Sequence, residues 1–359
     1  MPHLTGLLLI DASASALNNL GTLTGERTDN KVGVKQIFVG SKSYPYVSAQ
    51  AFRYWLRTTL ETSGEIEWHN APIFREAKIA YTDSNPIRYW DDDLFGYMRA
   101  ESKKKGAKKE EEREETPTTA TLTRVSPFRV STLVAIAPTR VVDDFGVMAR
   151  HEGDPVPHEH QFYRSTLKGL LSLDLRSAGT FWTASKTGFK NLDQVRIKEA
   201  EESGLEKVTV DSMEAYRLSD RQRGARIASL LQGIAALEGG AKQSLHYTDV
   251  TPSFVLFAVT KGGNHPFNYV VQANRDGDPI IHTEALREVL RVYHDQILSP
   301  LYVGWPRGYM DGQREEVVSL LNKLRENHIL EDYVIGHPRE VVLQLAASFN
   351  DESHYKWLD

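Results

Sequence analysis

The sequence contains no cysteine among its 359 residues. This absence excludes disulfides, cysteine-ligated zinc, iron–sulfur clusters and thiol catalysis, and it fits a reducing compartment. Long apolar runs are absent as well, because no stretch approaches the roughly 20 apolar residues that a membrane helix needs. The apolar run at residues 7–10 is interrupted by Asp11 and is too short for a signal peptide. We therefore expect a cytoplasmic protein with no membrane partner.

An excess of basic residues is also missing. Lysine and arginine number 43 against 48 aspartate and glutamate, which gives a formal net charge of −5. Proteins that bind nucleic acid tend to be basic overall. Any nucleic-acid role of this chain would therefore need a local basic groove, with acidic residues placed elsewhere.

Signatures of common catalytic sites are missing too. The sequence has no G-x-S-x-G nucleophile elbow and no Walker or Rossmann glycine fingerprint. His158 and His160 would point the same way on a strand and could bind a metal with an acid, but a polar loop entering a strand explains them equally well. We expect no catalytic residue, no metal site and no cofactor.

What the chain does contain is a regular succession of strands and helices. Residues 4–12 form a near-continuous apolar run typical of a buried strand. The glycine-rich segment 15–43 is expected to be a loop or hairpin, with a possible short strand at 32–39. The later expected elements are strands within 120–138, strands within 158–182 with a break near Gly169, a helix at 221–237, a strand at 244–261 paired with 267–273, and helices at 283–297, 312–327 and 338–348.

With the insertions removed, the order of these elements is strand, helix, strands, helix, strand. This order is close to β-α-β-β-α-β, the ferredoxin-like arrangement that RNA-recognition domains also use. We therefore expect an α/β (α+β) fold whose sheet has two helices on one face and an open second face.

The stretch YPYVSAQAFRYWLRTTLE, residues 44–61, predicts an amphipathic helix that begins at Ser48. Ser48 is a favourable N-cap and the first turn has no acid, so free N–H groups and the positive dipole end remain available to an anion. Gln50, Arg53 and Arg57 share a face of this helix. Solvated arginines on an amphipathic helix are the alternative explanation.

A glycine pair, Gly239-Gly240, follows the helix expected at 221–237. It is typical of a helix C-cap, but glycine also lets a backbone approach a ligand closely. Lys242, Gln243 and Ser244 follow the pair directly.

The first sixty residues are similar to the DevR family, the backbone subunits of type I-B-like CRISPR Cascade complexes. The segments LLIDASA, NNLG, NKVGVKQI and YPYVSAQAFRYWLR occur in this order within residues 4–61. The likeness continues more loosely through RVSPFRVSTL, HQFYRSTLKGLLSLDL and GGAKQSLHYTDVTPSFV. This resemblance implies a non-catalytic protein of antiviral defence.

The resemblance also implies an RNA-recognition-like palm with large finger and thumb insertions. On this basis we expect the first palm part at 1–62 with the loop 15–43, the fingers at 63–161, palm strands at 162–182, the thumb at 183–219, and the second palm part with C-terminal helices at 220–359. In the family, the thumb is the hairpin that folds over the guide RNA and flips out one base at regular intervals.

The partners implied by the resemblance are CRISPR RNA, a target DNA strand, further copies of the chain and other Cascade subunits. Several copies would polymerise head-to-tail along the guide, which gives an open helical filament, and base pairing would read the target. The RNA-binding residues carried over are Asn18, Asn19, Lys35, Ser48, Gln50, Arg53, Arg57, Lys242, Gln243 and Ser244.

Two alternatives remain open. The chain could be a type III-like backbone subunit that cleaves target RNA, with Asp29 as the acidic residue. It could also be a metal-dependent hydrolase centred on His158 and His160.

Overall fold

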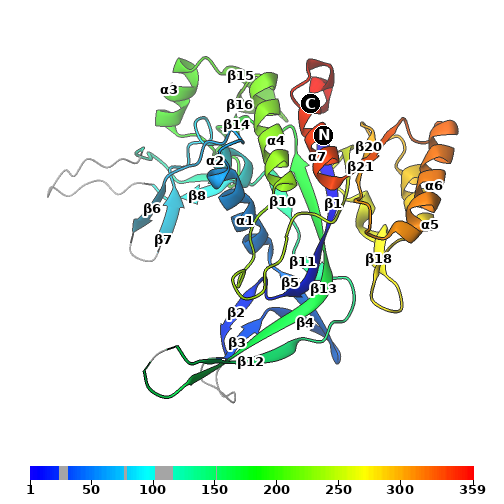
Figure 1. Ribbon diagram of the computed structural model, residues 1–359. Coiled ribbons are helices and arrows are strands. Elements are labelled where there is room, and N and C mark those ends of the chain that lie inside the picture. The colour runs from blue at the N-terminus through cyan, green and yellow to red at the C-terminus, as the bar shows by residue number, and fades with distance from the viewer. Residues whose placement is uncertain (24–30, 77–78, 102–115, 151) are drawn as a thin grey trace.

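The computed structural model describes residues 1–23, 31–76, 79–101, 116–150 and 152–359. The fold is α+β, as the sequence predicts, and is built on a large, mostly antiparallel sheet (Figure 1). Within the described residues the strands of this sheet are β1 (Pro2–Ser15), β2 (Asn19–Thr22), β3 (Lys31–Val34), β4 (Gln36–Val39), β5 (Lys42–Val47), β10 (Phe128–Val130), β11 (Leu133–Ala135), β12 (Val142–Met148), β13 (Val156–Asp174), β17 (Phe254–Lys261), β20 (Leu301–Gly304) and β21 (Tyr333–Gly336).

β1 lies in the middle of the sheet and pairs antiparallel with β13 on one side and β17 on the other. Leu7 of β1 faces Leu170 of β13 and Leu256 of β17. β10 and β11 pair antiparallel with the far edge of β13. The central strands therefore lie in the order β17-β1-β13-β10/β11. Since β1 is covered on both faces, its apolar residues run almost without interruption, as the sequence indicates.

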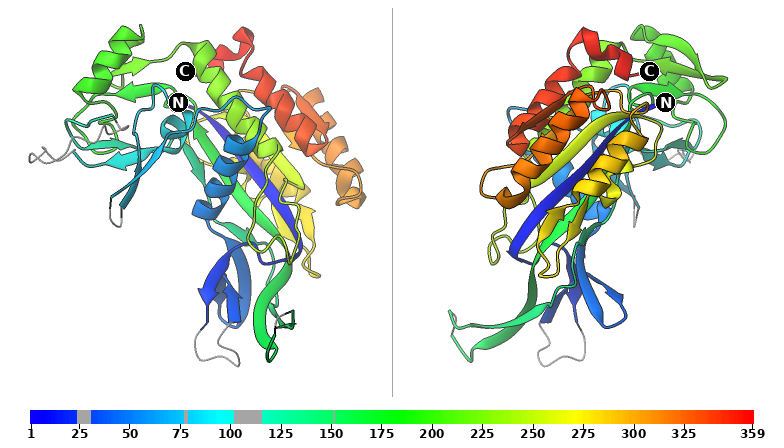
Figure 2. Two further views of the ribbon diagram at one scale, coloured as in Figure 1. Left: turned by 60° about the vertical axis from the view of Figure 1, so that its left-hand side comes forward. Right: turned by 90° about the vertical axis from the view of Figure 1, so that its right-hand side faces the viewer.

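One face of the sheet is covered by α1 (Ala49–Thr62), α4 (Asp220–Ala235) and α7 (Pro338–Ser348), which Figure 2 shows side by side. Phe52 of α1 and Ile227 of α4 pack in the same core as Leu8 of β1. A Cβ at Gly233 of α4 would lie 2.6 Å from the Leu60 side chain, so glycine allows these two helices to approach closely. Among the described residues, no helix is both long and apolar enough to cross a membrane.

The second face of the sheet is not open over β1, β17 and β20, which corrects the sequence-based expectation. α5 (Thr283–Val292) and α6 (Arg314–Glu326) cover it, and Leu7 and Leu9 of β1 pack in a second core with Leu286 and Leu321. The predicted pairing of 244–261 with 267–273 is also wrong. β18 (Val271–Ala273) pairs with β19 (Pro279–Ile281) instead, because the chain first turns through the 3-10 helix η1 (Pro266–Tyr269).

The described residues within 64–127 combine with residues 175–218 into a unit beside the sheet, here called the side lobe. It contains β6 (Ile73–Glu76), β7 (Ile79–Thr82), α2 (Trp90–Phe95), β8 (Tyr97–Arg99), β9 (Leu122–Arg124), β14 (Thr180–Trp182), α3 (Gln194–Glu202), β15 (Glu206–Val210) and β16 (Met213–Arg217). The fully buried Arg196 joins the two segments, since it donates to the carbonyls of Ser84 at 2.7 Å and Asp83 at 2.6 Å.

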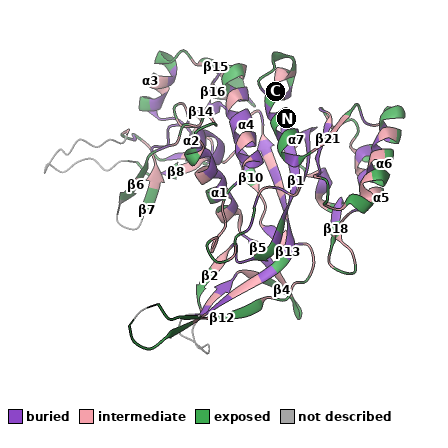
Figure 3. Cartoon of the chain, in the orientation of Figure 1, coloured by how far each residue is buried: buried purple, intermediate pink, exposed green. Residues whose placement is uncertain are grey.

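β12 and the first half of β13 form a hairpin that projects away from the helices (Figure 2). Its described residues, 142–150 and 152–162, are here called the arm. Most of β12 is exposed (Figure 3). β13 continues without interruption past Gly169, so the predicted break there is wrong. The expected boundary between residues 161 and 162 falls inside this strand, and the range 63–161 is divided among the side lobe, β10, β11 and the arm.

Candidate nucleic-acid interface

The N-terminus of α1 is held by the segment that follows the buried part of β1. The Ser48 hydroxyl accepts a hydrogen bond from the Ala51 N–H at 3.3 Å, and the Ser48 N–H donates to Asn18 Oδ1 at 2.9 Å. The first turn of α1 carries no acidic residue. The predicted helix and its serine cap are therefore confirmed, and no acid of that turn neutralises the positive end of the helix dipole.

Three segments that are far apart in the sequence meet beside this cap. The Lys35 N–H donates to the Asn18 carbonyl at 3.0 Å, and the Ala241 N–H donates to the Leu17 carbonyl at 3.1 Å. Lys35 and Lys242 are both half-buried, and neither forms an ion pair within the described part of the chain. We call Asn18, Lys35, Ser48 and Lys242 the lysine site. It brings the backbones of two lysines that have no ion pair in the described residues close to an acid-free helix end, a combination that favours an anion.

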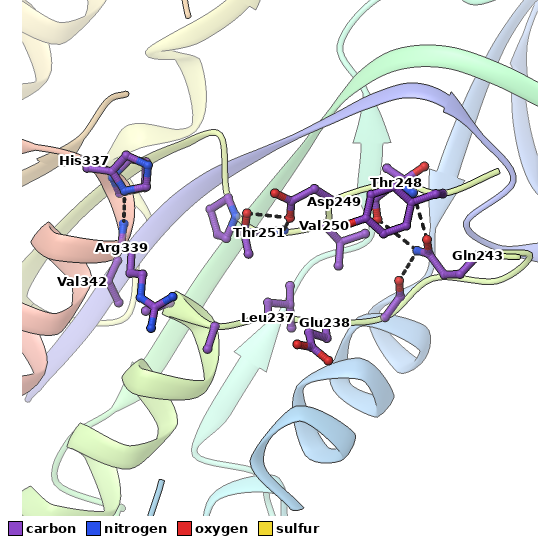
Figure 4. A pocket seen from close by; sticks show the side chains of 16 residues that line it. Leu237, Glu238, Gln243, Thr248, Asp249, Val250, Thr251, His337, Arg339 and Val342 are labelled. Carbon is purple, nitrogen blue, oxygen red and sulfur yellow. Dashed lines mark hydrogen bonds between the residues drawn. The ribbon is translucent and has the colours of Figure 1, made fainter. Parts of the chain in front are cut away.

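The Gln243 side chain forms hydrogen bonds within the loop that begins at Gly239-Gly240, here called the glycine loop. Its Nε2 donates to the carbonyls of Gly239 and Thr248, and its Oε1 accepts from the Thr248 N–H at 2.9 Å (Figure 4). These bonds use most of the hydrogen-bonding capacity of the amide. The loop they close borders a cavity of about 640 Å³ between the end of α4 and the start of α7, where His337 and Arg339 lie.

Arg53 lies on the flank of α1 that faces the side lobe. Its Nη2 donates to the Phe95 carbonyl at 2.5 Å and to Ser126 Oγ at 3.2 Å, and its Nη1 lies 3.5 Å from the Phe128 carbonyl. Burial, together with the charge of Arg57, lowers the pKa of Arg53 to about 10. Arg53 therefore already links α1 to α2 and β10.

Arg57 lies on the same flank, 4.3 Å from the centre of the Phe95 ring. Its Nε is buried and has no hydrogen-bond partner among the described residues. Burial lowers the pKa of Arg57, while the charges of Asp91 and Asp92 oppose this shift. Arg53 therefore makes three hydrogen bonds to the fold, whereas Arg57 makes none within the described residues.

The remaining predicted residues are distributed around the lysine site. Gln50 and Ser244 are exposed, and Asn19 is half-buried with an Oδ1 that lacks a partner in the described residues. Thus Asn18, Lys35, Ser48 and Lys242 come together, whereas Arg53 and Arg57 lie on a different flank of α1.

The histidines of the hydrolase alternative stack at the base of the arm. The rings of His158 and His160 lie 6.1 Å apart, and the His246 ring lies 4.8 Å from His160. Burial and the neighbouring His246 lower the pKa of His160. No group of three or more histidine and acidic residues that could hold a metal occurs in the described ranges. Asp29, the acid of the cleavage alternative, lies outside the described residues.

The sequence reasoning missed Tyr54 and a buried acidic run. Tyr54 is 67% exposed on α1 although it is a large aromatic residue, and its position outside the apolar stripe was the available signal. Asp91, Asp92 and Asp93 are all buried in α2. Burial and the charge of Asp91 raise the pKa of Asp92 to about 7. Three consecutive acids give no sequence signal of burial, since such runs are usually solvated.

Comparison with known proteins gives matches among solved structures. No family model and no curated protein matches the sequence. A chain of a "CRISPR RNA-guided surveillance complex, pre-nicking" aligns with a TM-score of 0.52 and 11% identity, over 97% of this chain and 99% of that one. A chain of a "CRISPR RNA-guided surveillance complex" aligns with a TM-score of 0.49 and 12% identity, over 96% and 99%. At 11% identity, the alignment with the chain of the pre-nicking complex shows that the two chains share a fold.

Proposed function

We propose that this chain is a non-catalytic backbone subunit of a Cascade-type complex, of the DevR kind, that binds CRISPR RNA and polymerises along it. The observation that carries the proposal is the lysine site. Lys35 and Lys242, which are distant in the sequence, flank residues 17–18 without counter-ions in the described chain, beside the acid-free N-terminus of α1. A phosphate backbone supplies the anions that such a site lacks.

The shared fold supports the same proposal. The structure that aligns with a TM-score of 0.52 belongs to an RNA-guided surveillance complex, and the alignment covers both chains almost completely. The antiparallel order β17-β1-β13-β10/β11, with α1 and α4 on one face, agrees with the RNA-recognition-like palm that the DevR resemblance implies. The partners then include a target DNA strand, further copies arranged head-to-tail, and other subunits of the complex.

We assign the thumb role to the arm instead of residues 183–219. Residues 183–218 of that range belong to the side lobe, where Asn191 and Arg196 are fully buried. The arm projects as an exposed two-stranded hairpin, which supports a role in closing over an extended ligand. Phe145 and Met148 expose 51% and 59% of their surface on it and could contact unstacked bases.

The salt dependence of RNA binding tests the proposal. Each lysine contact to single-stranded phosphate contributes about 0.7 to the slope of log K against log salt. Changing Lys35→Glu with Lys242→Glu should therefore lower that slope by about 1.4 and weaken binding at least about 10-fold. The measurement is fluorescence anisotropy of a labelled single-stranded RNA of about 30 nucleotides, long enough to span several copies, at several salt concentrations.

A matched control carries the same charge change far from the site. Lys261→Glu with Lys323→Glu alters two exposed lysines on β17 and α6 and should leave the slope nearly unchanged. Sedimentation with the unlabelled RNA should show multimers for the control pair and loss of multimers for the Lys35/Lys242 pair. Wild-type protein that binds no RNA, or equal losses in both pairs, would contradict the proposal.

A further inference from the structure

A pocket of about 420 Å³ lies between α1 and the glycine loop. The helix contributes Tyr54, Trp55 and Thr58, and the loop contributes Gly239 and Gly240. Asn18 of the lysine site lines it as well. We call this the α1–loop pocket. Its volume falls in the range of cavities that hold small organic ligands.

The shape of the α1–loop pocket is fixed by hydrogen bonds and close packing. The Glu238 N–H donates to the Thr59 hydroxyl at 2.9 Å, and that hydroxyl lies 3.2 Å from the Glu238 carbonyl. Gly239 has a φ of +151°, and a Cβ there would lie 2.4 Å from the Trp55 side chain. Glycine thus lets the loop backbone lie directly against Trp55, and the pocket exists before a ligand arrives.

The lining of this pocket suits a neutral, planar ligand and not a phosphate. Glu238 is its charged residue, and an acid repels an anion. Asn18 Oδ1 accepts from the Ser48 N–H, so the Asn18 amide keeps two donors that have no partner in the described residues. Tyr54, two-thirds exposed, offers an aromatic face at the rim. An aromatic face with neutral donors is the chemistry that recognises a nucleobase.

The backbones of the two lysines of the lysine site adjoin residues that line this neutral pocket. Lys242 follows Ala241 of the lining, and the Lys35 N–H is bound to the carbonyl of Asn18. A nucleotide likewise joins a charged phosphate to a neutral ring. We propose, on the basis of the proposed RNA-binding function, that the α1–loop pocket holds one unpaired nucleobase stacked on Tyr54 while Lys35 and Lys242 contact the adjoining phosphates.

Removing the ring of Tyr54 tests this inference. Tyr54→Ala should weaken binding of a 12-nucleotide single-stranded RNA about 10-fold, within the range that one stacked base contributes. It should leave unchanged the binding of an abasic ribose-phosphate oligomer of equal length, which carries the phosphates without bases. Tyr54→Phe keeps the aromatic face and should stay within about 2-fold of wild type. Tyr269→Ala, which alters a tyrosine of similar exposure (68%) on η1, is the matched control.

The outcomes separate this inference from the proposed function. If wild type binds the two oligomers equally tightly, or Tyr54→Ala behaves as Tyr269→Ala, the base pocket is refuted while RNA binding through the lysine site stands. If wild type binds neither oligomer, the proposed function fails and the pocket inference fails with it. Loss of affinity for the RNA alone, restored by phenylalanine, supports the pocket.

Discussion

The side lobe and the lysine site use charged residues in opposite ways. In the side lobe, the fully buried Asp93 accepts hydrogen bonds from Arg124 and from Arg226, the latter at 2.7 Å, and from the Gly179 N–H at 3.0 Å. At the lysine site, Lys35 and Lys242 are half-buried and have no ion pair in the described residues. The same chain therefore pairs its buried arginines with a shared carboxylate in one region and leaves two half-buried lysines without an ion pair in another.

This difference shows that the role of a cation depends on its counter-ion more than on its position in the sequence. Arg124 and Arg226 join α2, β9 and α4 through one carboxylate, so their charge is used within the fold. Burying an unpaired charge is costly, and a chain can leave lysines uncompensated where water or a ligand anion solvates them. The formal net charge of −5 is a sum over the whole chain, so it does not show which cations are paired and which are not.

The largest effect should come from removing the shared carboxylate. Asp93→Ala leaves Arg124 and Arg226 buried without a counter-ion, and we expect the free energy of unfolding to fall by about 3–5 kcal/mol. Urea unfolding followed by tryptophan fluorescence measures this change. Glu202→Ala removes an exposed partner of Lys198 on α3 and should cost less than about 1 kcal/mol. Equal losses for the two variants would show that Asp93 does not hold the side lobe to the core.

A second prediction concerns Asp92, the neighbour of Asp93, which forms no ion pair with an arginine within the described residues. Burial and the charge of Asp91 raise its pKa to about 7 in the folded state, above the value near 4 expected after unfolding. The folded protein therefore holds one more proton between these values, and its stability should fall as pH rises from about 4 to about 7. The loss should be roughly 2–3 kcal/mol between pH 5 and pH 8.

The variant Asp92→Asn removes this titration. The difference in unfolding free energy between Asp92→Asn and wild type should increase from pH 5 to pH 7 and then become constant. Asp332→Asn, at an acid that is 56% exposed, is the control and should give a nearly flat difference. A flat difference for Asp92→Asn would show that this carboxyl is ionised throughout the range.

The sequence predicted the central elements well where one physical signal dominated. The apolar run of β1 and the serine-capped amphipathic α1 were confirmed because burial on both faces and helix capping leave direct marks in the residue pattern. The cover of α5 and α6 over the second face could not be predicted, since Leu286 and Leu321 show that a helix has an apolar side but not which surface it packs against.

The candidate site was predicted in part for a similar reason. The acid-free cap drew attention to Ser48, and the glycine pair to Lys242, but their meeting depends on hydrogen bonds through residues 17–18 that join three distant segments. The flank occupied by Arg53 depends on how α2 packs against α1. Helical spacing placed Gln50, Arg53 and Arg57 on one face but gave no information about what that face contacts.

The smallest predicted effect separates structural from ligand-binding arginines on α1. Arg53→Ala removes the bonds to the carbonyls of Phe95 and Phe128, and we expect the unfolding free energy to fall by about 1–2 kcal/mol. The salt slope of RNA binding should not change, because three hydrogen bonds already hold the guanidinium against the carbonyls of Phe95 and Phe128 and the Ser126 hydroxyl. Urea unfolding and anisotropy titrations on the same preparation measure the two quantities.

Arg57 provides the internal comparison, since it lies one turn further along the same flank and makes no hydrogen bond through its buried Nε. If the predicted RNA contact at this flank is real, Arg57→Ala should lower the salt slope by about 0.7 while stability changes less than in Arg53→Ala. If Arg53→Ala lowers the slope and Arg57→Ala does not, the division of cations into paired and uncompensated groups does not predict which of them bind RNA. If neither variant changes the slope, the RNA path is confined to the side of α1 that carries Asn18, Lys35 and Lys242.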